Sequence, residues 1–336
     1  GLLEKNIVLG NALVDMYAKC GALAKAENTF NTLLVRDVIS WNALISGYAQ
    51  HGLNDEVFGC FKKMHEEGLT PDAVTFVCIM KACGSLGSSE KAEEIHAEVR
   101  NHALLGKNIM ICNALVDMHA KCGSLAKARE VFDDLPARDI FSWNALISGY
   151  VKHGLDAESL RCFAKMKEES ISPDGVTFVC ILKACSGMGS MEKGEDVHVE
   201  MGKHGFIERD IIVGSALVDM YAKFGAIEKA QRVFNELHVR DVVAWSALIA
   251  GYSQLGQIKG VFSMFDQMIT EGIVPTLVTF IALLTACSHT GLVDEGQVLF
   301  TAMNTIYSLT PTHDHYTCMV DLFSRAGHFD KAVILI

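Results

Sequence analysis

The chain has 336 residues, and half of them are apolar, so it has enough apolar side chains to bury a large core. Its formal net charge of −11 excludes a protein that holds nucleic acid mainly by bulk positive charge, because neutralising phosphates requires clustered Lys and Arg. The chain contains no run of about 18 consecutive apolar residues and therefore predicts no transmembrane helix.

An internal repeat runs through the chain. The stretch ISWNALISGY at residues 39–48 recurs as FSWNALISGY at 141–150 and as VAWSALIAGY at 243–252. The three tryptophans of these stretches lie 102 residues apart. A fixed period indicates a repeated structural unit, and we expect the recurring tryptophans to be core residues.

The first unit divides into three helical hairpins, in chain order 7–37, 38–72 and 73–108. In the first hairpin Leu13, Val14 and Tyr17 follow helical spacing, Gly21 supplies a turn, and a second helix follows. Hairpins of 31, 35 and 36 residues recur from residues 109 and 211, and a truncated copy begins at 313. Such helix pairs bury their apolar faces only by stacking, so we expect an all-α solenoid with one continuous core.

The cysteines follow the same period. The eleven cysteines allow two interpretations, a framework of disulfides or a set of buried free thiols. Residues that recur with the repeat most simply fill the same small apolar niche in each copy, so we expect buried thiols and a reducing compartment. The recurring cysteines are Cys20 with Cys122, Cys60 with Cys162, Cys78 with Cys180, and Cys83 with Cys185.

Three His-x-Glu triplets begin like a zinc-deaminase signature. They pair His65 with Glu67, His96 with Glu98, and His198 with Glu200. Zinc-deaminase chemistry also needs a Cys-x-x-Cys pair, and the sequence has none. We assign the triplets to structural helices and expect neither a catalytic residue nor a bound metal or other cofactor.

Two polar positions recur in the first and second hairpins. The fifth residue can exchange hydrogen bonds on an inner face, although a solvated first-turn residue is the alternative. The last residue precedes a helix, where an N-cap is expected, and capping is compatible with ligand discrimination. The fifth residues are Asn11, Asn42, Asn113, Asn144, Ser215, Ser246 and Thr317, and the last residues are Asp37, Asp72, Asp139, Asp174, Asp241 and Thr276.

The stretch WNALISGYAQHG, the terminal GLTPD and the alternation of hairpin lengths resemble the plant pentatricopeptide repeat (PPR) family, specifically its PLS subclass. The resemblance implies a right-handed superhelix of helix-turn-helix repeats. It also implies that residues 1–6 end a preceding L-type repeat and that 313–336 form a truncated S-type repeat. Between them lie three S-P-L triplets, 7–108, 109–210 and 211–312, whose hairpins are S-type, P-type and L-type in that order.

In this family the fifth and last residues of a repeat together select one base of single-stranded RNA. The resemblance implies uracil for Asn with Asp, guanine for Ser with Asp, and a purine for Ser246 with Thr276 and for Thr317. The L-type repeats carry Val77, Val179 and Ile281 at the fifth position, and their bases stay unassigned. The expected RNA is UUNUUNGRNR, read 5′ to 3′ along the chain.

Two further sets of residues take a role from the resemblance. Apolar second residues sandwich bases in the family, with core packing as the alternative; here they are Val8, Ile39, Met110, Phe141, Ile212 and Val243. A basic residue near the end of the first helix can touch phosphate, with a solvated side chain as the alternative; here it is Lys19, Lys121, Lys152, Lys223 or Arg325.

Similarity to PLS proteins implies the specificity part of an organellar C-to-U RNA editing factor, in mitochondrion or chloroplast. Deamination would be performed by a separate or missing C-terminal domain, so we expect no enzyme activity here. Besides RNA, the implied partners are multiple organelle RNA editing factor proteins, which would contact the L-type repeats. The resemblance implies no binding to a membrane. A tetratricopeptide-like scaffold for proteins, which shares the helix-pair architecture, is one alternative. An RNA processing or stability factor without an editing role is another.

Overall fold

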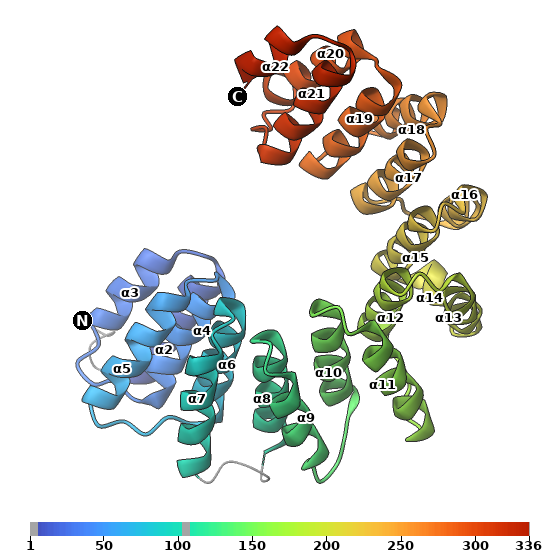
Figure 1. The fold of residues 1–336 in the computed structure, drawn as a ribbon. Helices are drawn as coiled ribbons and strands as arrows, with labels where there is room; N and C mark the ends of the chain where they lie inside the picture. Colours follow the sequence, from blue (N-terminus) through green and yellow to red (C-terminus); the bar gives the residue numbers. More distant parts are fainter. Residues whose placement is uncertain (1–5, 103–107, 336) are drawn as a thin grey trace. The chain divides into compact units, whose positions relative to one another are not determined.

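The structure is a computed structural model that describes residues 6–102 and 108–335 (Figure 1). All regular secondary structure in these two ranges is helical. The chain divides into two compact units, residues 1–172 (unit 1) and 173–336 (unit 2). In the described part no helix is long and apolar enough to cross a membrane. The expected end of a preceding repeat, residues 1–6, lies outside the described ranges except for Asn6, which is the N-cap of the first described helix.

Unit 1 consists of helical hairpins. Their helices are α2 (Ile7–Lys19) with α3 (Leu23–Asn31), α4 (Val38–Gln50) with α5 (Asn54–Glu66), α6 (Ala73–Leu86) with α7 (Ser89–Asn101), α8 (Ile109–Lys121) with α9 (Leu125–Asp133), and α10 (Ile140–Lys152) with α11 (Asp156–Glu168). Each first helix packs against its own second helix and against the first helix of the next hairpin. The first helices therefore form one layer of the unit, and the second helices cover it on one side (Figure 1).

Unit 2 repeats this arrangement. Its helices are α12 (Gly175–Gly187) with α13 (Met191–Lys203), α15 (Ile211–Lys223) with α16 (Ile227–Glu236), α17 (Val242–Gln254) with α18 (Ile258–Thr270), α19 (Leu277–Thr290) with α20 (Val293–Thr305), and α21 (His313–Arg325) with α22 (Phe329–Leu335). A short helix, α14 (Phe206–Arg209), joins α13 to α15. The predicted all-α fold of helix-turn-helix repeats is confirmed.

The recurring tryptophans lie in the core, as expected. Trp41 is 2% exposed and Trp245 is fully buried. In each copy the indole meets a phenylalanine of the preceding helix edge-on, as with Phe30 and Trp41, whose ring centroids lie 4.6 Å apart. Edge-to-face contact of this kind adds to the free energy gained by burying the rings.

Small residues let neighbouring first helices approach closely. A Cβ atom at Gly47 would lie 2.4 Å from the Cβ of Ala18, so α4 meets α2 at a point where only glycine fits. Gly149 and Ala120 make the same contact between α10 and α8. The glycine of the repeated stretch therefore sets the spacing of the first helices.

The cysteines form no disulfide in the described ranges. Six thiols are buried and four are half-buried, in agreement with the expected apolar niches, whereas Cys20 is exposed at the end of α2. Burial raises the pKa of the Cys60 thiol to about 11, so that thiol stays protonated and unreactive at neutral pH.

Candidate nucleic-acid interface

The carboxylates that end the repeats cap the helices that follow them. Asp37 accepts a hydrogen bond from the Ser40 amide at 2.8 Å, and Asp72 accepts one from the Thr75 amide at 3.0 Å. The Ser40 hydroxyl in turn accepts from the Asp37 amide, which completes a capping box. Asp139, Asp174 and Asp241 occupy the same N-cap position before α10, α12 and α17.

The same carboxylates bind the fifth residue of their own repeat in unit 1. The side-chain amide of Asn11 donates to Asp37 Oδ1 at 3.1 Å, and that of Asn42 donates to Asp72 Oδ1 at 2.9 Å. Asn113 donates to both oxygens of Asp139, at 3.0 and 3.1 Å. The two positions that sequence analysis pairs within a repeat are therefore in direct contact in these three repeats.

A hydroxyl fixes the other end of two of these amides. Ser40 Oγ donates to Asn11 Oδ1 at 2.7 Å, and Thr75 Oγ1 donates to Asn42 Oδ1 at 2.6 Å. An asparagine side chain has two donor hydrogens and two acceptor lone pairs. These contacts therefore leave one N–H and one lone pair of each amide unused.

The third amide of unit 1 is held differently. Ser142 Oγ donates to the main-chain oxygen of Asp139 at 2.8 Å instead of to Asn113. Asn113 Oδ1 is buried and has no hydrogen-bond partner in the structure. The amide of Asn113 is therefore fixed by its donor side alone.

In unit 2 the polar fifth residues, Ser215, Ser246 and Thr317, carry hydroxyl groups. Ser215 Oγ donates to Asp241 Oδ1 at 2.7 Å, which commits its only hydrogen and leaves the pair with acceptors alone. Ser246 instead exchanges a hydrogen bond with Thr279 Oγ1 at 2.7 Å, and Thr279 in turn contacts Thr276. Thr317 donates to the His313 carbonyl of its own helix at 2.9 Å.

The pair formed by Asn144 and Asp174 is divided between the units. Asn144 lies half-buried on α10 of unit 1, and Asp174 is the N-cap of α12 in unit 2. Each occupies the position in its repeat that the other Asn and Asp residues occupy.

The fifth residues are mostly covered, while their carboxylate partners are more open. Asn42 is 9% exposed and Ser215 is 1% exposed, whereas Asp72 is exposed and Asp37 is half-buried. Burial opposes ionisation of Asp37, but hydrogen bonds from Ser40 and Asn11 outweigh it and lower the pKa of Asp37. The accessible partner in this pair is therefore an ionised carboxylate at neutral pH.

The apolar second residues point away from the core. Their exposed fractions run from 48% at Met110 to 74% at Val8, so the alternative that these side chains pack in the core is wrong for this set. The third hairpin of each 102-residue unit carries an equivalent residue, Val74, Val176 or Val278, which is also exposed and was not among the predicted residues. The signal in the sequence that could have identified them is their place as the second residue of the first helix of each hairpin. In each unit these side chains follow one another along consecutive first helices.

The basic residues at the ends of the first helices are paired with acids. Lys19 Nζ lies 2.7 Å from Asp15 Oδ2, and Lys121 Nζ lies 2.7 Å from Asp117 Oδ2. Lys223 with Asp219 and Arg325 with Asp321 repeat this pairing in unit 2. Lys152 differs, since it donates to the Lys121 carbonyl at 3.0 Å.

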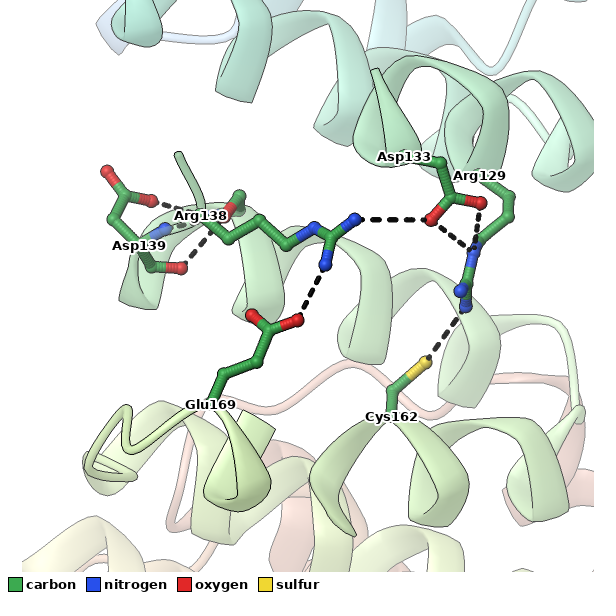
Figure 2. Close-up of polar contacts among 7 residues, drawn as sticks. Arg129, Asp133, Arg138, Asp139, Cys162 and Glu169 are labelled. Carbon is green, nitrogen blue, oxygen red and sulfur yellow. Dashed lines mark hydrogen bonds and ion pairs between the residues drawn. The ribbon is translucent and has the colours of Figure 1, made fainter. Parts of the chain in front are cut away.

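An arginine directly precedes three of the capping carboxylates, Asp37, Asp139 and Asp241, and positions the loop that ends there. Figure 2 shows the Arg138 guanidinium between the carboxylates of Glu169, at 2.6 Å, and Asp133, at 3.7 Å. The guanidinium also covers the Phe132 ring, 4.9 Å from its centroid. Equivalent ion pairs join Arg36 to Glu67 and Arg240 to Glu271. Because Arg138 directly precedes Asp139, this ion pair holds the start of α10 against α11.

The His-x-Glu triplets do not converge on a metal site. His65 pairs with Glu98 at 3.0 Å, and His96 Nδ1 lies 2.9 Å from His119 Nε2. His198 contacts the Tyr221 hydroxyl. Within the described ranges no group of three or more His, Cys, Asp or Glu side chains is arranged to hold a metal ion.

Models of a known repeat family match most of the chain. The model of the "PPR repeat family" matches residues 36–85, 138–187 and 240–289. The "PPR repeat" model matches residues 74–102, 110–140, 176–206, 215–242, 278–305 and 314–336. The matched segments therefore extend over both units.

Plant relatives resemble the chain over nearly its full length. The Arabidopsis thaliana "Pentatricopeptide repeat-containing protein At1g06140, mitochondrial" is 35% identical over 98% of this chain and 59% of its own length. A second Arabidopsis thaliana relative of this chain, "Pentatricopeptide repeat-containing protein At4g25270, chloroplastic", is 36% identical over 100% of this chain and 62% of its own length. The chain spans about half the length of other curated relatives. Among solved structures, PPR10 in complex with an 18-nt psaJ RNA element aligns over 97% of this chain and 59% of that chain, with 18% identity and a TM-score of 0.47. On the family models and on the relatives, the chain belongs to the pentatricopeptide repeat family.

Proposed function

We propose that the chain binds single-stranded RNA and that each S-type or P-type repeat reads one base through its fifth and last residues. The observation that carries this proposal is the direct hydrogen bond between the two positions, as in Asn42 with Asp72 and Ser215 with Asp241. The bond fixes two polar groups relative to each other beside an exposed apolar side chain. Preorganised polar groups of this kind recognise a base edge at a low entropic cost.

The hydrogen-bonding capacity of the Ser215–Asp241 pair favours guanine. Because Ser215 donates its hydrogen to Asp241, both side chains present only acceptors to a ligand. Guanine has two neighbouring donors, N1–H and the N2 amino group, on its Watson–Crick edge. Uracil has one ring N–H, and adenine and cytosine each have one amino group, so none of them matches two separate acceptors.

The Asn–Asp pairs offer a different pattern. Asn42 keeps one N–H after donating to Asp72, and that carboxylate keeps free lone pairs. A donor beside an acceptor suits the O4 and N3–H groups of uracil. This pattern also suits other bases, so the assignment of uracil rests on the family resemblance.

The exposed second residues supply contact for the faces of the bases. Apolar side chains such as Val8, Ile39 and Phe141 lie exposed on first helices of unit 1, and a row of exposed apolar side chains is typical of a binding surface. Flat bases inserted between consecutive side chains would bury this surface. Stacking of this kind is tolerant of sequence, so it would add affinity while the polar pairs add discrimination.

We further propose that the chain is of the PLS subclass and is the specificity part of an organellar C-to-U editing factor. Three of its relatives carry the word mitochondrial or chloroplastic in their names, which supports an organellar location. The chemistry would belong to a separate domain, and the L-type repeats would contact editing-factor partners. The predicted target is UUNUUNGRNR.

A base analogue tests the readout at the seventh base, which faces Ser215 and Asp241. Fluorescence anisotropy should be measured with the predicted RNA, with inosine in place of the seventh guanine, and with a scrambled RNA of the same composition. Inosine lacks the N2 amino group, so we expect a loss of about tenfold in affinity. The scrambled RNA should bind about a hundredfold more weakly or worse, since several bases are mismatched. Equal affinity for all three RNAs would refute the proposal.

A further inference from the structure

We propose that Asp15 and Asp117 in unit 1, and Asp219 and Asp321 in unit 2, restrain the basic residue of each S-type repeat and thereby limit its attraction for phosphate. This inference rests on the proposed RNA binding. It assigns to these four acids a positioning role that controls how much of the binding free energy comes from sequence-independent contacts.

The acids lie on the same helix face as the proposed base contacts. Along α2, Val8, Asn11, Asp15 and Lys19 follow one another at intervals of three or four residues, which places them on one stripe of an α-helix. The side chains of Asp15 and Lys19 are 40% and 62% exposed. A strand of RNA that contacts Val8 and the Asn11–Asp37 pair would therefore pass close to both charges.

The acid is confined to one repeat type. The ninth residue of the first helix is aspartate in every S-type repeat, whereas the P-type repeats carry Ser46, Ser148 and Ala250, and the L-type repeats carry Lys81, Lys183 and Thr285. Lys152, at the thirteenth position of a P-type repeat, has Ser148 one turn before it and no carboxylate there. Lys152 donates instead to the Lys121 carbonyl, so the chain contains a natural comparison between lysines that are paired with a carboxylate and one that is not.

The electrostatic consequence follows from the geometry. A carboxylate 2.7 Å from the Lys121 ammonium leaves the local net charge near zero. A phosphate gains little from such a site, because it must compete with Asp117 for the ammonium and is repelled by the acid. The S-type repeats then contribute base readout with little bulk attraction, which agrees with the net charge of −11. Intrahelical ion pairs of this kind also stabilise a helix slightly, so the test must separate binding from stability.

The test replaces both acids of unit 1 in the full chain. We compare Asp15→Asn/Asp117→Asn with a control of the same charge change, Asp55→Asn/Glu90→Gln, which alters exposed acids in the first turns of α5 and α7. Affinity for the predicted RNA and for its scrambled counterpart is measured over a range of salt concentrations. Thermal unfolding of each variant shows whether its fold is intact.

We expect the Asp15→Asn/Asp117→Asn variant to bind both RNAs more tightly, by roughly threefold for each acid removed. The plot of log affinity against log salt should steepen by up to about 0.7 for each lysine released onto a phosphate. Lys152→Met should weaken binding more than Lys19→Met, because only Lys152 lacks a competing carboxylate.

Two outcomes overturn the inference in distinguishable ways. If wild type prefers the predicted RNA but Asp15→Asn/Asp117→Asn changes affinity and salt slope no more than the control does, the acids have no positioning role and the proposed readout stands. If wild type binds neither RNA, the proposed function fails and the inference fails with it.

Discussion

The side chains of Asn42 and Asp72 are joined by a 2.9 Å hydrogen bond although they lie at opposite ends of their repeat. Asp72 is also the N-cap of α6, so one carboxylate both starts the next helix and orients the amide of the previous first helix. In the proposed readout, helix capping and base recognition therefore depend on the same carboxylate. A substitution at Asn42 changes the hydrogen-bonding pattern of the pair without removing the cap.

Asn42→Ser should change the base preference of its repeat. A serine there can donate its hydrogen to Asp72, as Ser215 does to Asp241, which would leave acceptors alone. We expect a loss of about tenfold to a hundredfold on RNA with uracil at the second base, and recovery when that base is guanine. Anisotropy titrations of both proteins against both RNAs measure this exchange. A uniform loss on both RNAs, with an unchanged melting temperature, would mean that Asn42 does not read a base.

The order of the helices follows from the sequence pattern, because turn glycines and apolar periodicity are local signals. Whether the side chain of each second residue points into the core or into solvent does not follow from the sequence pattern. Ile39 and Phe141 are as apolar as core residues, and hydrophobicity alone predicts burial for them. Their exposure is decided by the neighbouring helices, since α4 and α10 turn the next two residues, Ser40 with Trp41 and Ser142 with Trp143, inward. Tertiary packing therefore determines which apolar residues remain available for a ligand.

The polar contacts divide in a similar way. The ion pair of Asp15 with Lys19 spans four residues of one helix and is visible in the sequence as a local pattern. The hydrogen bond from Ser40 to Asn11 is not visible in the sequence. Ser142 occupies the same position of its repeat, but its hydroxyl donates to a main-chain oxygen instead. Rotamer choice at a shared position depends on surroundings that differ from copy to copy.

That difference predicts unequal effects of two matched substitutions. Ser40→Ala removes the hydrogen bond to Asn11 Oδ1 together with the capping contact, whereas Ser142→Ala removes contacts to Asp139 alone. We expect Ser40→Ala to lower the free energy of unfolding by about 1 kcal/mol more than Ser142→Ala. It should also weaken discrimination at the first base. Urea unfolding followed by circular dichroism gives the comparison, and equal losses would contradict the different roles of the two hydroxyls.

The recurring tryptophans provide a second matched pair. Trp41 Nε1 donates to Glu67 Oε2 at 2.9 Å, whereas Trp143 Nε1 is buried and has no hydrogen-bond partner in the structure. Substitution by phenylalanine removes a similar part of the ring in both cases. Trp41→Phe should therefore cost about 1 kcal/mol more than Trp143→Phe, because only Trp41→Phe breaks a hydrogen bond to a charged group. Unfolding in urea measures both costs. A larger loss for Trp143→Phe would show that its indole N–H has a partner in solution.

The buried histidine pair of unit 1 makes stability depend on pH. Burial is the main cause that lowers the pKa of both His96 and His119, and it brings the pKa of His119 to about 4, against a usual value of 6.5. The unfolded chain then binds more protons than the folded chain between about pH 4 and 6.5, so the free energy of unfolding falls as the pH falls through this window. From pH 7 to pH 5 the loss from His119 should be about 2 kcal/mol.

His119→Tyr is the matched variant, because Tyr221 holds the equivalent position in unit 2 and accepts or donates a hydrogen bond with His198 at 2.8 Å. A tyrosine does not take up a proton in this range, so the variant should lose most of the dependence contributed by His119 while keeping a hydrogen bond to His96. The measurement is urea unfolding of wild type and His119→Tyr at pH 7 and at pH 5, followed by circular dichroism. If both proteins lose the same stability between the two pH values, the dependence arises from other groups and His119 titrates normally in the folded chain.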